Sequence, residues 1–179
     1  HKEGLQPLRK AIQLKPSFIE ALYLLGRFNT ILENYQNAIS TLKKVNNFES
    51  GFNETDFLLG KSLLKVNQHH DALPFLKKAV KNNPKHAQAQ YFLGLSLIKT
   101  EKIKEAIKPL KMAVEYQPDF SEALNYLGET YQRLGNYPDA IQAFKKAIKI
   151  DSGLTTAFNS LGTIYTLQKE YAKAVHYFK

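Results

Sequence analysis

The sequence has no cysteine and no tryptophan among its 179 residues, and it has a single methionine. The lack of cysteine excludes disulfide bonds and thiol chemistry within the chain, but it does not choose between cytosol and periplasm. No apolar run approaches the roughly 18 residues that a membrane-spanning helix needs. These absences leave a chain that must be held together by ordinary packing.

Catalytic and metal-binding motifs are also missing. The chain contains no P-loop, no HExxH and no GxSxG segment. The paired histidines His69 and His70 point about 100° apart on a helix, so they cannot easily chelate one ion. His86 and His176 have no carboxylate or histidine at ligand spacing. We therefore expect no enzyme activity, no metal site and no cofactor.

Acidic residues are fewer than basic ones, 16 against 25, which gives a net charge of +9. A positive chain can attract nucleic acid, an anionic surface or an acidic peptide. The charge alone does not choose among these partners.

A periodic pattern fills the chain. The pair Leu-Gly recurs every 34 residues, an alanine follows twelve residues after each glycine, and a large apolar residue comes four later. The glycines are Gly26, Gly60, Gly94, Gly128 and Gly162; the alanines are Ala38, Ala72, Ala106, Ala140 and Ala174; the large residues are Leu42, Leu76, Leu110, Phe144 and Phe178. Around each glycine the apolar residues have the spacing of one helical face, and each unit predicts two helices joined by a tight turn.

This pattern resembles the tetratricopeptide repeat (TPR) family, and the resemblance covers essentially the whole chain. It implies an all-α, right-handed superhelical solenoid of antiparallel helix–turn–helix repeats that acts as a protein–protein interaction scaffold. The expected organisation is a single array over 1–179. It has a partial repeat at 1–18, full repeats at 19–52, 53–86, 87–120 and 121–154, and a truncated repeat at 155–179. Since both ends fall inside a repeat, we expect the chain to be a piece of a longer protein.

The repeated glycines need a steric explanation, because glycine costs about 1 kcal/mol in a helix interior relative to alanine. We predict that each glycine lets the second helix lie close to the first, with the repeated alanines on the other side of the contact. Large residues such as Phe144 and Tyr131 are expected to fill the wider gaps between repeats.

Asp56 and Gln90 stand at normally apolar positions, and Pro74 and Pro109 fall inside second helices, where proline should bend the chain.

The candidate binding surface is the face of each first helix opposite its core stripe. In the TPR family that face looks into a concave groove that binds extended or helical peptides. The residues placed there, with flanking basic residues, are Tyr23, Arg27, Phe57, Lys61, Lys65, Tyr91, Leu95, Lys99, Asn125, Glu129, Arg133, Asn159 and Thr163. An aromatic row beside basic groups suits a protein or peptide with apolar anchors and acidic flanks. The alternative is that Tyr23, Phe57 and Tyr91 only pack between neighbouring first helices.

Two other functions remain open from the sequence. The repeats are also compatible with the substrate-selecting arm of a larger enzyme such as a transferase. A recurring set of basic residues in the second helices forms a ridge that suits phosphates, although solvated lysines are common in this family and no aromatic residue interleaves with them. The ridge consists of Arg9, Lys10, Lys43, Lys44, Lys77, Lys78, Lys111, Lys145 and Lys146. We interpret it as a solvated face, so nucleic acid is not the expected partner.

Finally, the ends of the array predict self-association. Leu5, Leu8 and Ile12 lack a preceding helix, and Leu161, Tyr165 and Phe178 lack a following one. Apolar stripes exposed at both ends would stack end to end.

Overall fold

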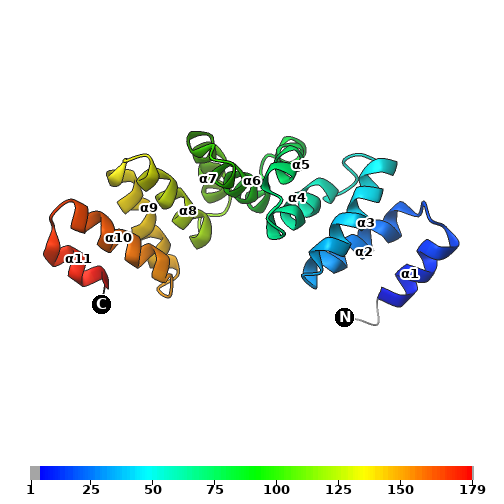
Figure 1. Ribbon diagram of the computed structural model, residues 1–179, viewed down its shortest axis with the longest axis horizontal. Coiled ribbons are helices and arrows are strands. Elements are labelled where there is room, and N and C mark those ends of the chain that lie inside the picture. Colours follow the sequence, from blue (N-terminus) through cyan, green and yellow to red (C-terminus); the bar gives the residue numbers. More distant parts are fainter. Residues whose placement is uncertain (1–4, 179) are drawn as a thin grey trace. The chain divides into compact units, whose positions relative to one another are not determined.

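The computed structural model describes residues 5–178, and every regular element in that range is an α-helix (Figure 1). The prediction of an all-α fold is confirmed. In chain order the helices are α1 (Leu5–Leu14), α2 (Ile19–Ile31), α3 (Tyr35–Phe48), α4 (Thr55–Lys65), α5 (His69–Asn82), α6 (Ala87–Lys99), α7 (Ile103–Tyr116), α8 (Ser121–Arg133), α9 (Tyr137–Ile150), α10 (Thr155–Leu167) and α11 (Tyr171–Phe178).

The helices divide into two compact units, His1–Pro84 and Lys85–Lys179. Unit 1 holds α1 to α5, and unit 2 holds α6 to α11. A single continuous array over 1–179 stays a prediction.

Within each unit the helices pack as antiparallel pairs that stack on one another. The pairs α2–α3 and α4–α5 lie in unit 1, and α6–α7, α8–α9 and α10–α11 lie in unit 2. The second helix of one pair contacts the first helix of the next, as α3 does with α4 and α7 with α8. First helices also contact one another, α2 with α4, α6 with α8, and α8 with α10. One face of each unit is therefore formed by first helices alone, and we call it the first-helix face.

The close approach at the repeat glycines is confirmed, with a different partner from the one predicted. A Cβ added to Gly94 would lie 2.6 Å from Leu110 Cγ, and one added to Gly128 would lie 2.7 Å from Phe144 Cε1. The other three repeat glycines are blocked in the same way by the large residue of their own second helix. The Phe144 ring covers Gly128 within its own helix pair, a role that the sequence pattern did not assign to it; its filling of a gap between repeats stays a prediction.

The turn inside each pair has one geometry throughout. Glu33, Asn67, Glu101, Gly135 and Lys169 recur one repeat apart, and all five have a positive φ, between 58° and 74°. The N–H of the following residue then donates to a carbonyl five residues back, as Asn136 does to Tyr131 at 2.9 Å. This is the Schellman ending of a helix, which usually has glycine at the left-handed residue. Only Gly135 meets that preference.

Polar and proline departures are accommodated inside these helices. α5 and α7 run through Pro74 and Pro109 without ending. Asp56 is only 3% exposed, and neither of its carboxylate oxygens has a hydrogen-bond donor among the described residues. The Asn46 side-chain oxygen is buried and unsatisfied in the same way. Burial raises the pKa of Asp56, and the nearby Lys78 opposes that shift.

Among residues 5–178, no helix has the length and hydrophobicity required to span a membrane.

Candidate protein-binding surface

On the first-helix face of unit 1, two predicted aromatic anchors are buried. Tyr23 is 8% exposed and Phe57 is 6% exposed. The Tyr23 ring packs edge-on against Phe52, with ring centroids 5.6 Å apart. Burial, with a smaller contribution from the Glu54 carboxylate, raises the pKa of the Tyr23 hydroxyl. The burial favours the packing alternative for these two rings.

The basic residues of the same face are more accessible. Arg27 and Lys65 are exposed, and Lys61 is half-buried on α4. Burial lowers the pKa of Lys61, and the positive charge of Lys65 adds to the effect, while Glu33 opposes it. Unit 1 therefore presents positive charge rather than aromatic rings.

On the first-helix face of unit 2, an aromatic cluster reaches solvent. Tyr91 is partly exposed, and its ring centroid lies 4.8 Å from that of Phe120 and 5.8 Å from that of Tyr126. Burial is the main cause that raises the pKa of Tyr91. Leu95 lies one helical turn further along α6 and is also half-buried. Sequence reasoning did not include Tyr126 in the site, although its place directly after Asn125 on the same helix was a usable signal.

Polar contacts occupy the middle of this face. The Asn125 side-chain amide nitrogen donates to Glu129 Oε1 at 2.7 Å, and its oxygen accepts from Thr156 Oγ1 at 3.4 Å. Burial raises the pKa of Glu129, while the hydrogen bond from Asn125 and the charges of Lys99 and Arg133 oppose that shift. Asn125 is buried and its amide is engaged within the molecule, so it positions Glu129 and α10 instead of facing a groove.

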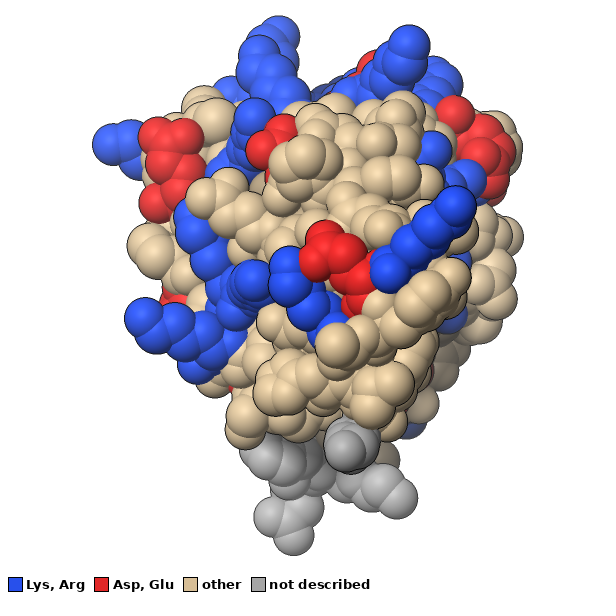
Figure 2. All heavy atoms as spheres, turned by 90° about the vertical axis from the view of Figure 1, so that its left-hand side faces the viewer, with Lys and Arg blue, Asp and Glu red and all other residues tan. Residues whose placement is uncertain are grey.

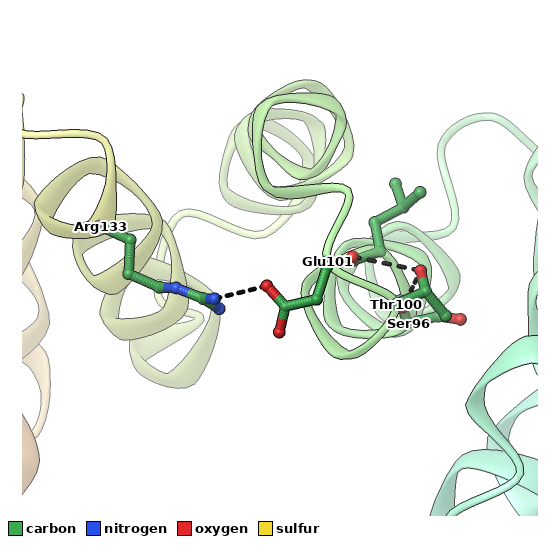
Figure 3. A network of polar contacts seen from close by, with 5 residues as sticks. Ser96, Thr100, Glu101 and Arg133 are labelled. Atoms are coloured by element: carbon green, nitrogen blue, oxygen red, sulfur yellow. Dashed lines mark hydrogen bonds and ion pairs between the residues drawn. The ribbon is translucent and has the colours of Figure 1, made fainter.

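Arg133, expected as a basic residue flanking the groove, has a partner in the structure. Its guanidinium donates to Glu101 Oε2 at 2.8 Å, joining the end of α8 to the turn after α6 (Figure 3). Thr100, next to Glu101, donates to the backbone oxygens of Ser96 and Leu97 at 2.9 and 3.2 Å. Since both members of the ion pair are largely solvated, the pair orients Arg133 more than it stabilises the fold.

The remaining predicted residues lie at the surface. Lys99 is exposed at the end of α6, and Asn159 and Thr163 are exposed on α10. Thr163 Oγ1 donates to the Asn159 backbone oxygen at 2.8 Å. The structure thus brings Tyr91 and Lys99 of α6 near Tyr126 and Glu129 of α8, while Asn159 and Thr163 lie on the next first helix, α10.

The basic residues of the ridge are exposed, and two of them lie near aromatic rings. Lys111 Nζ is 5.8 Å from the centroid of the Tyr131 ring, and Lys145 Nζ is 6.0 Å from that of Tyr165. The expectation that no aromatic residue interleaves with the ridge is therefore wrong. Both rings are buried, so they offer no free surface on which a base could stack. Among residues 5–178, no cluster of three or more His, Asp or Glu side chains has the arrangement of a metal site.

At the ends, the exposed apolar residues are only partly the ones expected, and Phe178 is the one expected residue that is exposed rather than buried or half-buried. Leu5, Leu161 and Tyr165 are buried within their own units, so the prediction that they are exposed is wrong. The apolar side chains that face solvent are Leu14, Leu167, Tyr171, Val175 and Phe178. Figure 2 views the molecule from the side of α10 and α11, and uncharged residues make up much of the surface facing the viewer. End-to-end association stays a prediction.

Stacked helix pairs with an accessible face of first helices define a helical repeat scaffold. Family models of the tetratricopeptide repeat match residues 19–49 and 121–154, and the model of anaphase-promoting complex, cyclosome, subunit 3 matches residues 47–113. A crystal structure of MamA is 30% identical in sequence, with a TM-score of 0.80, over 86% of this chain and 90% of that one. The chain belongs to the tetratricopeptide repeat family.

Two further solved structures are similar. YrrB, described as a TPR protein with an unusual peptide-binding site, is 27% identical over 87% of this chain and 80% of its own, with a TM-score of 0.78. MamA from Desulfovibrio magneticus RS-1 is 27% identical over 86% of each chain, with a TM-score of 0.77. Comparison with curated proteins gives no match. The repeats and these neighbours make the chain a protein–protein interaction scaffold.

Proposed function

We propose that the protein binds segments of a partner protein on its first-helix faces, each unit by itself: unit 2 takes apolar anchors, and unit 1 takes acidic residues. The observation that carries this proposal is the partly exposed cluster of Tyr91, Leu95 and Tyr126 on unit 2. The peptide-binding site named for the similar YrrB supports the same class of function.

Unit 2 supplies the apolar part of the interaction. Half-buried aromatic and aliphatic side chains are held in place by packing, so a partner side chain that covers them loses little conformational entropy. Such anchors usually dominate binding, and truncating one costs on the order of 2 kcal/mol. Lys99 lies one helical turn beyond Leu95 on α6 and offers hydrogen-bond donors to a partner backbone.

Unit 1 supplies positive charge. Lys61 is held half-buried near Lys65, and burial together with that like charge lowers its pKa. A partner carboxylate beside Lys61 and Arg27 would relieve this repulsion, which favours acidic residues in the bound segment. Tyr23 and Phe57 are excluded as anchors in this proposal because they are buried.

The test is selection of a displayed random-peptide library on the full chain, followed by fluorescence anisotropy of the selected peptides. We expect peptides in which apolar residues are flanked by Asp or Glu. Leu95→Glu should weaken binding about tenfold or more, whereas Leu14→Glu, a control at a leucine that is 80% exposed on α1, should not. Arg27→Glu combined with Lys65→Glu should weaken peptide binding, and the loss of affinity should be larger at low salt than at high salt. The control is Lys77→Glu combined with Lys81→Glu, a matched pair of exposed lysines on α5.

Selected peptides that bind the Leu95→Glu variant as tightly as the wild type, while that variant keeps its helical circular dichroism, would remove the first-helix face of unit 2 from the proposal. Equal losses in the two charge-reversal pairs would remove the role assigned to Arg27 and Lys65.

A further inference from the structure

A second surface lies on the other side of unit 2, between the second helices α7 and α9 and above α8. Here the structure has a hollow of about 220 Å³ whose floor includes Leu124 and Leu127 and whose rim includes Lys111, Lys146 and Asp139. An adjoining hollow of about 450 Å³ shares Val114, Leu124 and Lys146 with it and adds Pro118, Lys149 and Ile150. Because the two hollows share three residues, they form one groove, which we call the α7–α9 groove.

The accessible interior of the adjoining hollow is mainly apolar, whereas the first hollow has a larger polar share, with Gln142, Asp139 and two lysines in its lining. Val114 is half-buried, and Ile150, at the end of α9, is 43% exposed although it is a large aliphatic side chain. Leu124 and Leu127 close the floor beneath them and are almost fully buried. Covering Val114 and Ile150 with another apolar side chain would remove that surface from water, which is favourable in proportion to the area covered.

The rim of the groove is positive. Lys111, Lys146 and Lys149 are exposed, and Asp139 is the one acidic residue among the groove's lining residues. The Asp139 carboxylate already accepts a hydrogen bond from the Asn136 side chain at 2.7 Å, at the first turn of α9. The Asp139 charge is thus partly compensated by a hydrogen bond within the protein. With three ammonium groups against one carboxylate, the net charge of the rim is positive.

The corresponding place in unit 1, between α3 and α5 and above α4, has different chemistry. Two repeats earlier in the sequence, Val114 corresponds to Asn46 and Leu124 to Asp56. Both of these residues carry buried oxygens without a hydrogen-bond donor among residues 5–178. An acidic, polar floor would disfavour an acidic apolar segment, so the combination of aliphatic floor and basic rim belongs to unit 2.

We propose that the α7–α9 groove is a docking site for a protein segment that presents an apolar side chain flanked by Asp or Glu residues. The aliphatic floor takes the apolar side chain, and the lysine rim pairs with the flanking carboxylates. A complete drug-sized ligand usually needs about 300–1,000 Å³ of enclosed space. The first hollow, at about 220 Å³, is smaller than this, and the adjoining hollow of about 450 Å³ is open to solvent, so the groove suits side chains of a peptide better. Nucleic acid is a poorer fit, because the only ring in the groove lining, Tyr131, is buried and the floor is aliphatic.

The first experiment measures binding of defined probes to the full chain. A short fluorescein-labelled peptide of alternating Leu and Glu is compared with peptides of alternating Ser and Glu and of alternating Leu and Lys, and with a labelled single-stranded oligonucleotide. We expect the Leu–Glu peptide to bind most tightly, because it alone satisfies both the floor and the rim. Equal binding of the Ser–Glu peptide, equal binding of the Leu–Lys peptide, or tighter binding of the oligonucleotide would each overturn the proposal.

The second experiment locates the bound peptide. In methyl NMR spectra of the full chain, the Leu–Glu peptide should shift the signals of Val114, Leu124 and Ile150. Shifts confined to Leu95 would place the peptide on the first-helix face and overturn the assignment to this groove.

Variants then separate groove from general charge. Lys111→Glu with Lys146→Glu should weaken binding about tenfold or more, since attraction is replaced by repulsion at two sites. The control is Lys104→Glu with Lys108→Glu, two exposed lysines on α7 outside the groove lining, and it should change the affinity by about twofold or less. Ile150→Glu tests the apolar contact at an exposed position where loss of fold is not expected. Equal effects of the two lysine pairs, or a fully binding Ile150→Glu variant, would contradict the proposal.

Discussion

Replacing Gly94 with alanine tests the close helix contact on which every repeat depends. In an unobstructed helix this change stabilises by about 1 kcal/mol, because alanine is the better helix former. In this structure the added Cβ would lie 2.6 Å from Leu110 Cγ and 2.8 Å from Cδ2, closer than carbon atoms can approach. Leu110 is fully buried and cannot swing into solvent.

The expected sign follows from the two magnitudes. Overpacking a well-packed core costs about 1–3 kcal/mol, which exceeds the propensity gain of about 1 kcal/mol. Gly94→Ala should therefore lower the free energy of unfolding by up to about 2 kcal/mol. Leu110→Ala removes the obstructing side chain and by itself costs about 2–5 kcal/mol. In that background Gly94→Ala should become stabilising.

The measurement is a double-mutant cycle in which urea unfolding of each variant is monitored by far-UV circular dichroism. A coupling free energy of about 1–3 kcal/mol between the two sites is expected. Because repeat proteins need not unfold in one step, amide hydrogen exchange in α6 and α7 provides the local readout. If Gly94→Ala stabilises the wild type as much as it stabilises the Leu110→Ala variant, the steric explanation for the repeated glycines is refuted.

Three further predictions concern unit 1. Asp56→Leu should raise the free energy of unfolding by about 1–3 kcal/mol at about pH 7, because it removes a buried carboxylate without a hydrogen-bond donor. Since the folded-state pKa of Asp56 is raised above its ordinary value of 3.8, the wild type should gain stability relative to the Leu variant as the pH falls through the raised pKa; parallel pH–urea titrations check this sign. Glu33→Gly should stabilise by about 1 kcal/mol, because Glu33 has a φ of 58°, and an unchanged urea midpoint would contradict that reasoning. Tyr23→Ala should lower the free energy of unfolding by about 3 kcal/mol, because the ring is buried. A variant as stable as the wild type in urea unfolding would contradict the burial of Tyr23 and make it a surface residue again.

The helix pairs could be predicted from the sequence because the pattern recurs every 34 residues and the same residue types, glycine, alanine and a large apolar residue, stand at fixed positions in it. A glycine in a helix interior has no local advantage, so its return at every repeat pointed to a contact between helices. The sequence did not show which side chain makes that contact. The alanine and the large residue of the second helix recur with equal regularity, and only the coordinates place Leu110 and Phe144 over the glycines.

The accessibility of the candidate site was less predictable. Tyr23, Tyr91 and Asn159 stand at one repeat position, yet the first is buried, the second partly exposed and the third exposed. The repeat sets the direction of each side chain, but its exposure depends on the residues of the neighbouring helices and turns. Phe52 packs against Tyr23 and Phe120 packs against Tyr91 at the same repeat position, so this ring contact is common to both and does not set the difference in exposure. The pairing of Arg133 with Glu101 was equally unpredictable, because it joins two exposed residues that no local pattern connects.

The two units show how one backbone pattern yields different surfaces. At matching positions, unit 2 has Val114 and Leu124, whereas unit 1 has Asn46 and Asp56. The helices in both units have nearly the same bounds relative to the repeat, so these substitutions change the chemistry of a groove and leave its framework in place. The cost in unit 1 is a set of buried oxygens without donors, and the consequence in unit 2 is an aliphatic floor beneath exposed lysines. Binding specificity in such a scaffold therefore has to be derived repeat by repeat, from the side chains that the shared packing leaves accessible.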